Sequence, residues 1–234
     1  PAPTRARRYA AVMCNQYTPA SADQIARQFG VAMRADYHPA EVFPRSQGWF
    51  VRRQGEDGRE LVKGPWGLIP SFGQSAKLPY STNNARSEEL EAKASFRQPW
   101  ARGQRCIIPV ATFWEPCWET GKNVWWKFER ADGDAFGLAG LWNTWVDKST
   151  GEIVESYTML TLNADHHPLM ARMHKPDPKL PPDAQDKRMV VVLEPETWTD
   201  WLSAPVTQAR DLITVAPATV FKAAADTMHS SAKR

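Results

Sequence analysis

Short segments rich in apolar, β-branched and aromatic residues, separated by turn residues, recur along most of the chain. Their lengths and their patterns of alternation are typical of β-strands rather than of long helices. Eleven Trp and 19 Pro fit a chain of short strands and shaped loops. The expected strands are a hairpin over residues 49–62 that turns at Asp57–Gly58, and the segments 105–110, 123–130, 135–146, 153–163, 188–195 and 212–217.

Three short helices are expected among these strands, over residues 21–30, 87–96 and 195–202. In the first, Ser21 and Gln24 have the spacing of a capping box, and Gly30 is a typical helix stop. The sequence therefore predicts an α+β fold: a β-rich single domain with a curled, barrel-like, mainly antiparallel sheet and a few short helices.

The expected domain organisation is an N-terminal leader over residues 1–13, one domain over 14–220 and a flexible C-terminal tail over 221–234. The segment 175–187 contains four prolines and is expected to be a loop.

The composition narrows the class of protein. No apolar run approaches the roughly 18 residues that span a bilayer, and the first residues lack the apolar core of a signal peptide. We therefore expect a cytoplasmic protein without membrane contact, and a monomer.

A net charge of +3 permits nucleic-acid binding without requiring it. Three cysteines without CxxC spacing support neither a disulfide framework nor a zinc site, and we expect no metal or organic cofactor.

Cys14 directly follows Met13, which makes it either an internal residue or the first residue of the functional chain. A cysteine at the N-terminus carries an α-amine beside its thiol, and such a 1,2-aminothiol condenses with an aldehyde through an imine to a thiazolidine. The α-amine has a pKa of about 7.7 to 8.0 against about 10.4 for lysine, so far more of it is neutral near pH 7. The alternative is a small buried apolar residue.

Other candidate residues lie downstream. Glu115, among the aromatic residues of "TFWEPCWE", is expected to have a raised pKa that suits a proton shuttle; the alternative is a solvated strand glutamate. His174 in "LMARMHKP" is either a general acid and base or a structural histidine.

The segment "STNNARSEEL" contains Asn84 and Arg86, which suit a sugar or ligand oxygen and a phosphate, or form an ordinary turn and helix cap. In "GPWGLIPSF", Trp66 and Phe72 either stack on unpaired bases or belong to the core.

These motifs occur in one order: Met-Cys followed by an aromatic residue, "WGLIPSF", "NARSEE", "RCIIPVATFWEP", "AGLW", and "LMARMH" leading to "RMVVVLEP". In this order and spacing, the chain from Met13 to Pro195 resembles the SOS-response-associated peptidase family, also called abasic-site processing proteins. The resemblance implies a sensor of abasic sites in single-stranded DNA or near a junction of single and double strands. It implies lyase-like chemistry, in which an N-terminal cysteine traps the open-chain aldehyde as a covalent thiazolidine and protects the site in the DNA damage response.

The resemblance also implies roles for the candidate residues. The catalytic set would be Cys14 as nucleophile, Asn84 positioning it or the deoxyribose, Glu115 shuttling protons, and His174 assisting ring opening of the sugar. The DNA-binding set would be Arg86 and Arg188 at phosphates, with Trp66 and Phe72 lining the cleft for the flanking bases.

The chain departs from the common family pattern in four places. Asn15, Gln16 and Tyr17 replace Gly-Arg-Phe after the cysteine, and Phe72 replaces a Trp. Pro176 stands where an Arg is usual after the histidine, so that Arg188 is the nearest candidate, and 13 residues precede Cys14.

Two alternative functions remain open. The first is a cysteine-type peptidase that uses Cys14 with His174 and Glu115, its activity limited in one version to removal of its own leader. The second is a noncovalent single-stranded DNA-binding module, expected if Cys14 stays internal and has no α-amine.

Overall fold

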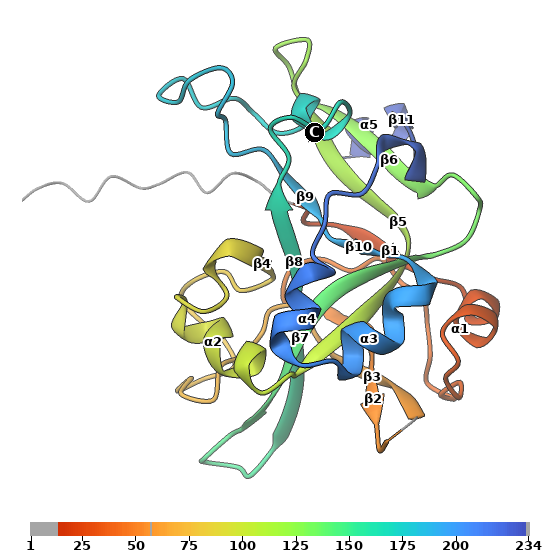
Figure 1. Cartoon of the computed structure of the whole chain (residues 1–234), viewed down its shortest axis with the longest axis vertical. Helices are drawn as coiled ribbons and strands as arrows, with labels where there is room; N and C mark the ends of the chain where they lie inside the picture. Colours follow the sequence, from red (N-terminus) through yellow and green to blue (C-terminus); the bar gives the residue numbers. More distant parts are fainter. Residues whose placement is uncertain (1–13, 57, 233–234) are drawn as a thin grey trace, which may run out of the picture.

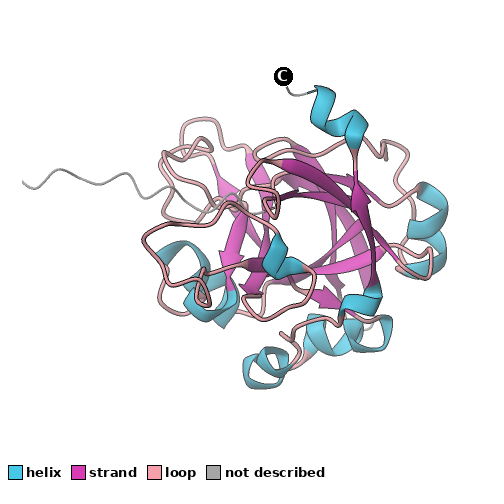
Figure 2. Ribbon diagram, turned by 90° about the horizontal axis from the view of Figure 1, so that it is seen from above, coloured by secondary structure: helices cyan, strands magenta, loops and turns pink. Residues whose placement is uncertain are grey.

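One curled sheet of 11 strands, with short helices around it, makes up the fold (Figure 1). The computed structural model describes residues 14–56 and 58–232. Seen from above, the strands curve around a common axis into a barrel-like shape (Figure 2). The pair of β4 (Asn84–Arg86) and β8 (Ile153–Asn163) runs parallel, and all other pairs of described strands run antiparallel. The predicted fold class is therefore confirmed.

The longest strand, β5 (Arg105–Cys117), holds the sheet together. It pairs with four other strands, and all but one of its 13 residues are buried. The remaining strands are β1 (Tyr17–Pro19), β2 (Gln47–Gln54), β3 (Gly58–Pro65), β6 (Val124–Arg130), β7 (Phe136–Val146), β9 (Arg188–Val190), β10 (Val192–Leu193) and β11 (Phe221–Ala225).

The expected strands agree with these elements in most places. The hairpin of β2 and β3 forms as predicted, although its turn precedes Gly58, which pairs with Gln54; Asp57 lies outside the described residues. The expected strand 105–110 extends to residue 117, and the segment 188–195 divides into β9 and β10. The segment 175–187 has no helix or strand, as expected for a loop.

Helix α1 (Ala22–Gln28) confirms the sequence signals that predicted it. Ser21 and Gln24 form both hydrogen bonds of the capping box, and Gly30 follows with φ of 62°. The expected helix 195–202 forms as a 3₁₀ turn (Pro195–Thr197) followed by α3 (Trp198–Ser203).

The expected helix 87–96 is wrong. A 3₁₀ turn (Ser87–Glu89) ends where Leu90 enters the core, and α2 (Ala94–Ala101) begins only after an extended Lys93. The burial of Leu90 fixes the direction of the chain there more strongly than helix propensity does.

The C-terminal region differs most from expectation. Residues 212–217 form no strand; they follow an unexpected helix, α4 (Val206–Asp211). The expected flexible tail begins instead with β11, which pairs with β6, and continues into α5 (Thr227–Ala232). The expected leader, residues 1–13, lies outside the described residues. None of the described helices is long and apolar enough to cross a membrane.

Phe221 explains why the C-terminal segment is ordered. Its buried ring lies 5.8 Å from Phe136, 6.1 Å from Phe128 and 6.4 Å from Phe113, measured between ring centroids. The segment is therefore tied to the core by an aromatic cluster as well as by the ladder with β6.

We predict that Phe221→Ala lowers the free energy of unfolding by about 3 kcal/mol, because it removes a buried ring from this cluster. Urea denaturation measures the change. Val215→Ala, which trims a side chain that is 52% exposed, is the matched control and should change the stability by less than about 0.5 kcal/mol. A Phe221→Ala protein as stable as this control would show that the tail is not part of the fold.

Candidate active site

Glu115, near the end of β5, carries a carboxylate that is almost fully buried. Two groups from distant parts of the chain meet it. The backbone N–H of Cys14 donates a hydrogen bond to the carboxylate, and Nε2 of His174 lies 2.9 Å from Oε2. The structure therefore brings together three of the four expected catalytic residues around one carboxylate.

Strand β1 brings Cys14 to this position. Tyr17 is paired with Phe113, and the backbone N–H of Trp114 donates to the carbonyl of Gln16 at 3.2 Å. Since the two strands run antiparallel, Cys14 lies alongside the C-terminal part of β5. Its thiol is 1% exposed and donates to the Gln16 carbonyl at 3.7 Å.

His174 reaches Glu115 from the same edge of β5 as Cys14 but nearer the end of the strand, since β6 occupies the other edge. Met173 forms a bridge with Cys117, and the N–H of His174 donates to the Pro116 carbonyl at 2.6 Å. His174 has φ of 62°, a left-handed conformation that costs a non-glycine residue about 1 kcal/mol or more. The short bridge and this turn of the backbone together direct the imidazole at the carboxylate.

Lys187 supports that strained turn. Its buried ammonium donates to the carbonyls of Met173 and His174, both at 2.6 Å. Burial lowers the pKa of Lys187. The sequence analysis missed this residue, because a lysine at the end of a proline-rich loop carries no signal that it turns inward.

Asn84 joins the site from β4. Its Nδ2 donates to the Cys14 carbonyl at 2.9 Å, while its buried Oδ1 has no hydrogen-bond partner. Nδ1 of His174 is likewise buried without a partner. Buried polar atoms are normally paired, so these two atoms are available to a ligand that enters the site.

The protonation of the central groups follows from their burial. Burial raises the pKa of Glu115 above its usual value, although His174 and the Cys14 N–H partly oppose this shift. Burial and the nearby Glu115 carboxylate raise the pKa of the Cys14 thiol well above its ordinary value. Glu115 can therefore donate a proton as well as accept one, and the free thiol is not a ready thiolate.

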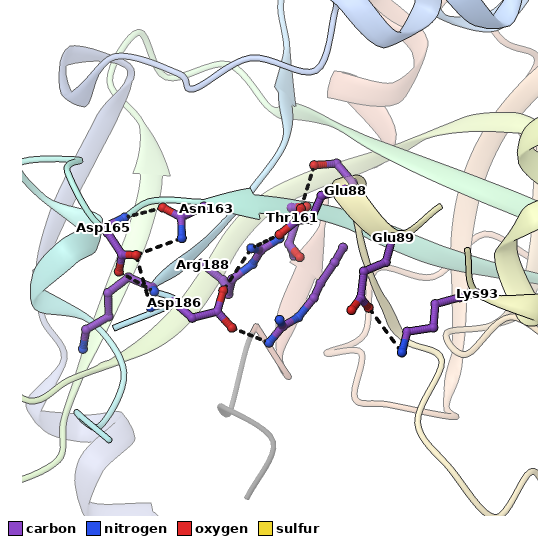
Figure 3. A network of polar contacts seen from close by, with 11 residues as sticks. Glu88, Glu89, Lys93, Thr161, Asn163, Asp165, Asp186 and Arg188 are labelled. Atoms are coloured by element: carbon purple, nitrogen blue, oxygen red, sulfur yellow. Dashed lines mark hydrogen bonds and ion pairs between the residues drawn. The ribbon is translucent and has the colours of Figure 1, made fainter. Parts of the chain in front are cut away.

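Arg86 and Arg188, the two expected phosphate contacts, lie in a network of charges beside the site. Arg86 pairs with Asp186 at 2.6 Å and is about one-third exposed. Arg188 is 1% exposed and contacts Glu88, Asp186 and the Thr161 carbonyl (Figure 3). A direct phosphate contact is open to Arg86 if it leaves Asp186, and the burial of Arg188 excludes one for that residue.

Glu88 is the main anionic partner of Arg188. Partial burial raises the pKa of Glu88, but the hydrogen bonds and charge of Arg188 outweigh it and hold the pKa at about 2. The pair therefore stays charged through the neutral range and fixes β9 to the 3₁₀ turn at Ser87–Glu89.

The two expected stacking residues have different environments. Trp66 is fully buried, its indole N–H donates to the Asn83 carbonyl at 2.7 Å, and its ring packs edge-on against Tyr17. It belongs to the core, so the expected base-stacking role is wrong for this ring. Phe72 is 52% exposed and remains accessible to a ligand.

The described residues contain no group of three or more His, Cys, Asp or Glu side chains that could hold a metal ion. The candidate site itself offers the nitrogen and the thiol of Cys14, the carboxyl group of Glu115, the imidazole of His174 and the amide side chain of Asn84.

Comparison with known proteins relates the chain to one family. The model of the SOS response associated peptidase (SRAP) family matches residues 13–230. The chain is 31% identical over 199 residues to the abasic site processing protein YoqW of Bacillus subtilis, covering 82% of this chain and 80% of YoqW. It is 25% identical over 182 residues to the abasic site processing protein HMCES of Gallus gallus, covering 66% and 49% of the two chains.

A solved structure of a protein from Bordetella bronchiseptica has the same fold. It superposes with a TM-score of 0.80 at 38% sequence identity, over 92% of this chain and 100% of that chain.

The charge network predicts a pH dependence of stability. Because the pKa of Glu88 in the folded protein is about 2, below its usual 4.5, its contribution is present above about pH 4.5 and is lost as the pH falls toward 2. We predict that Glu88→Gln lowers the free energy of unfolding at pH 7 by about 1 kcal/mol, kept small because Glu88 is half exposed. Urea denaturation across this pH range should show the difference from the unmodified protein disappearing toward pH 2.

Glu89→Gln is the control, because it removes a neighbouring carboxylate whose partner Lys93 is 3.7 Å away and exposed. A Glu88→Gln difference that is independent of pH, or matched by Glu89→Gln, would contradict the role of the Glu88–Arg188 pair.

Proposed function

The chain belongs to the SOS response associated peptidase family, and on this premise we propose that it processes abasic sites in DNA by forming a covalent crosslink through Cys14. The substrate is the open-chain aldehyde of an abasic site in single-stranded DNA or at a junction of single and double strands. The names of its relatives YoqW and HMCES, abasic site processing proteins, support this substrate class.

The hydrogen bond between the Cys14 nitrogen and the Glu115 carboxylate is the observation that carries the proposal. When Cys14 is the first residue, the same nitrogen is an α-amine, held beside a group that can take up its proton. An amine nucleophile must be neutral, and the low pKa of an α-amine, about 7.7 to 8.0, already favours this.

The proposed reaction has two bond-forming steps. The amine attacks the aldehyde carbon, and the resulting carbinolamine loses water to form an imine, with Glu115 supplying the proton that the leaving oxygen takes. The thiol then adds to the imine carbon, giving its proton to the nitrogen by way of Glu115, and closes the thiazolidine ring. A buried neutral thiol suits this second step, because it reacts after the imine has formed.

Asn84 and His174 complete the site in this proposal. Nδ2 of Asn84 fixes the Cys14 carbonyl, and its free Oδ1 accepts a hydrogen bond from a deoxyribose hydroxyl. The free Nδ1 of His174 faces the sugar oxygen during ring opening, while Nε2 exchanges a proton with Glu115.

DNA contacts beside the site come from fewer residues than the sequence suggested. Arg86 binds a backbone phosphate after exchanging its partner Asp186, and the exposed ring of Phe72 stacks on a flanking base. The protein acts as a monomer in the cytoplasm and protects the lesion in the DNA damage response.

We predict that protein beginning at Cys14 forms a heat-stable adduct with single-stranded DNA that carries one abasic site. Denaturing electrophoresis and intact mass should show one adduct, lighter than the sum of its parts by one water. Cys14→Ala should abolish it, because neither a thiol nor a thiazolidine is then available.

Cys106→Ala is the matched control, since it removes a different buried cysteine, which lies in β5 away from Glu115, and should crosslink normally. Equal crosslinking by Cys14→Ala, or by protein that retains residues before Cys14, would contradict the proposal. DNA binding that disappears with added salt and leaves no covalent product would support a noncovalent module instead.

The same geometry supports a second activity, removal by the protein of its own residues up to Met13. In this hydrolysis a water molecule adds to the carbonyl carbon of Met13 and the bond from that carbon to the Cys14 nitrogen breaks, with Glu115 placed to protonate the nitrogen as it leaves. A peptidase acting on other proteins through a Cys14–His174 pair has less support, because His174 contacts Glu115 while the thiol donates to Gln16.

We predict that a chain beginning at Pro1 shortens with time to one beginning at Cys14, as followed by intact mass. Glu115→Gln should slow this shortening at least tenfold, because an amide cannot deliver the proton. Glu119→Gln, which removes an exposed carboxylate just beyond β5 that pairs with Arg172 at 2.6 Å, should shorten at the normal rate. Equal rates in the unmodified and Glu115→Gln proteins would exclude self-processing by this carboxylate.

A further inference from the structure

A cleft at the opposite end of β5 from Glu115 has the character of a phosphate site, and we infer that it binds a phosphate group. The cleft has a volume of about 360 Å³ and lies between the end of α2, the segment joining α3 to α4, and Trp142 on β7. This volume is within the range of about 300 to 1,000 Å³ that is typical of small-molecule sites.

Three arginines line this cleft: Arg53, Arg102 and Arg105. No carboxylate is among its lining residues, and none of the three forms an ion pair with a described acidic residue. The neighbouring Arg52 differs, because it pairs with Glu60 at 2.7 Å and Glu155 at 3.2 Å. The positive charge of the cleft is therefore not neutralised by the protein itself.

Arg105 forms the floor of the cleft and is 2% exposed. Its Nε and Nη2 donate to the backbone carbonyls of Trp201 and Ala204, while its buried Nη1 has no hydrogen-bond partner. A buried guanidinium with only carbonyl partners keeps its full charge in a poorly solvated place. Its unpartnered Nη1 is therefore available to an anion that enters the cleft.

Arg53 and Arg102 lie at the exposed rim, where they can move onto a ligand. The Nε of Arg53 donates to the carbonyls of Gly55 and Glu56 at 2.9 and 3.1 Å, which leaves its terminal nitrogens for a ligand. Two exposed guanidinium groups at the rim of the cleft, together with the buried charge of Arg105, match the several oxygens of a phosphate better than a single carboxylate.

The cleft is separate from the candidate active site. Arg105 and Glu115 stand ten residues apart on the same strand, and about 3.3 Å per residue puts them at most about 33 Å from each other. The phosphate can therefore come from one of two sources: a small phosphorylated molecule, or the backbone of DNA whose lesion lies at Cys14, up to about ten base pairs away at roughly 3.4 Å per pair.

The first arm of the test uses inorganic phosphate and deoxyadenosine monophosphate as probes, with deoxyadenosine as the control that lacks phosphate. Isothermal titration calorimetry and the thermal unfolding midpoint report binding to the full chain. The double variant Arg53→Ala/Arg102→Ala should bind at least tenfold more weakly. Arg97→Ala, an exposed arginine of α2 outside the cleft, should bind normally.

The second arm uses DNA hairpins without an abasic site, each with a single-stranded overhang and a stem of five or 15 base pairs. Only the longer stem, about 51 Å at roughly 3.4 Å per pair, can reach the cleft from the site. If the cleft holds DNA backbone, the double variant weakens binding of the long hairpin at least tenfold and leaves the short one unchanged. This arm rests on the proposed function, whereas the first does not, and neither uses the aldehyde chemistry of Cys14.

A loss confined to the small probes identifies a small phosphorylated ligand, and a loss confined to the long hairpin identifies DNA backbone. Both outcomes support the site. If the double variant and Arg97→Ala match the unmodified protein in both arms, the cleft does not bind phosphate and the inference is wrong.

Discussion

The buried carboxylate of Glu115 is the interaction on which the site depends. It lies near the end of the longest strand, where one edge is paired with β6 and the other edge is followed first by the segment that carries Cys14 and then by the short bridge that carries His174. Burying a carboxylate is costly unless hydrogen bonds satisfy it, and here the Cys14 N–H and the His174 imidazole do so. The same two contacts that stabilise the buried acid therefore bring the Cys14 nitrogen, the carboxyl group and the imidazole together, so that folding itself assembles the candidate site.

That arrangement needs support from outside the sheet. The backbone of His174 is left-handed, and the ammonium of Lys187 binds the two carbonyls on either side of this turn. Lys187 is in turn adjacent to Arg188, whose buried guanidinium joins β9 to Glu88. Lys187 and Arg188 thus fix the end of the proline-rich loop to the rest of the protein. Lys187 also holds the backbone of His174 in place.

The sequence predicted the parts of the fold that local patterns govern. Alternation located most of the longer strands, and the spacing of Ser21 and Gln24 located α1. Local patterns failed where distant contacts decide: Phe221 belongs to the core because three rings from other strands surround it.

The candidate site divides in the same way. Residue type, motif order and family resemblance predicted Cys14, Asn84, Glu115 and His174, while the burial of Trp66 and Arg188 depends on packing that no local pattern encodes.

The central claim is that the amine and the thiol of Cys14 bond to one carbon of the abasic sugar. NMR of the adduct between ¹⁵N-cysteine-labelled protein beginning at Cys14 and DNA labelled with ¹³C at the aldehyde carbon tests it most directly. The account predicts a saturated carbon with one-bond coupling to the Cys14 nitrogen; an unsaturated imine carbon, or a carbon bonded to another residue, would contradict it.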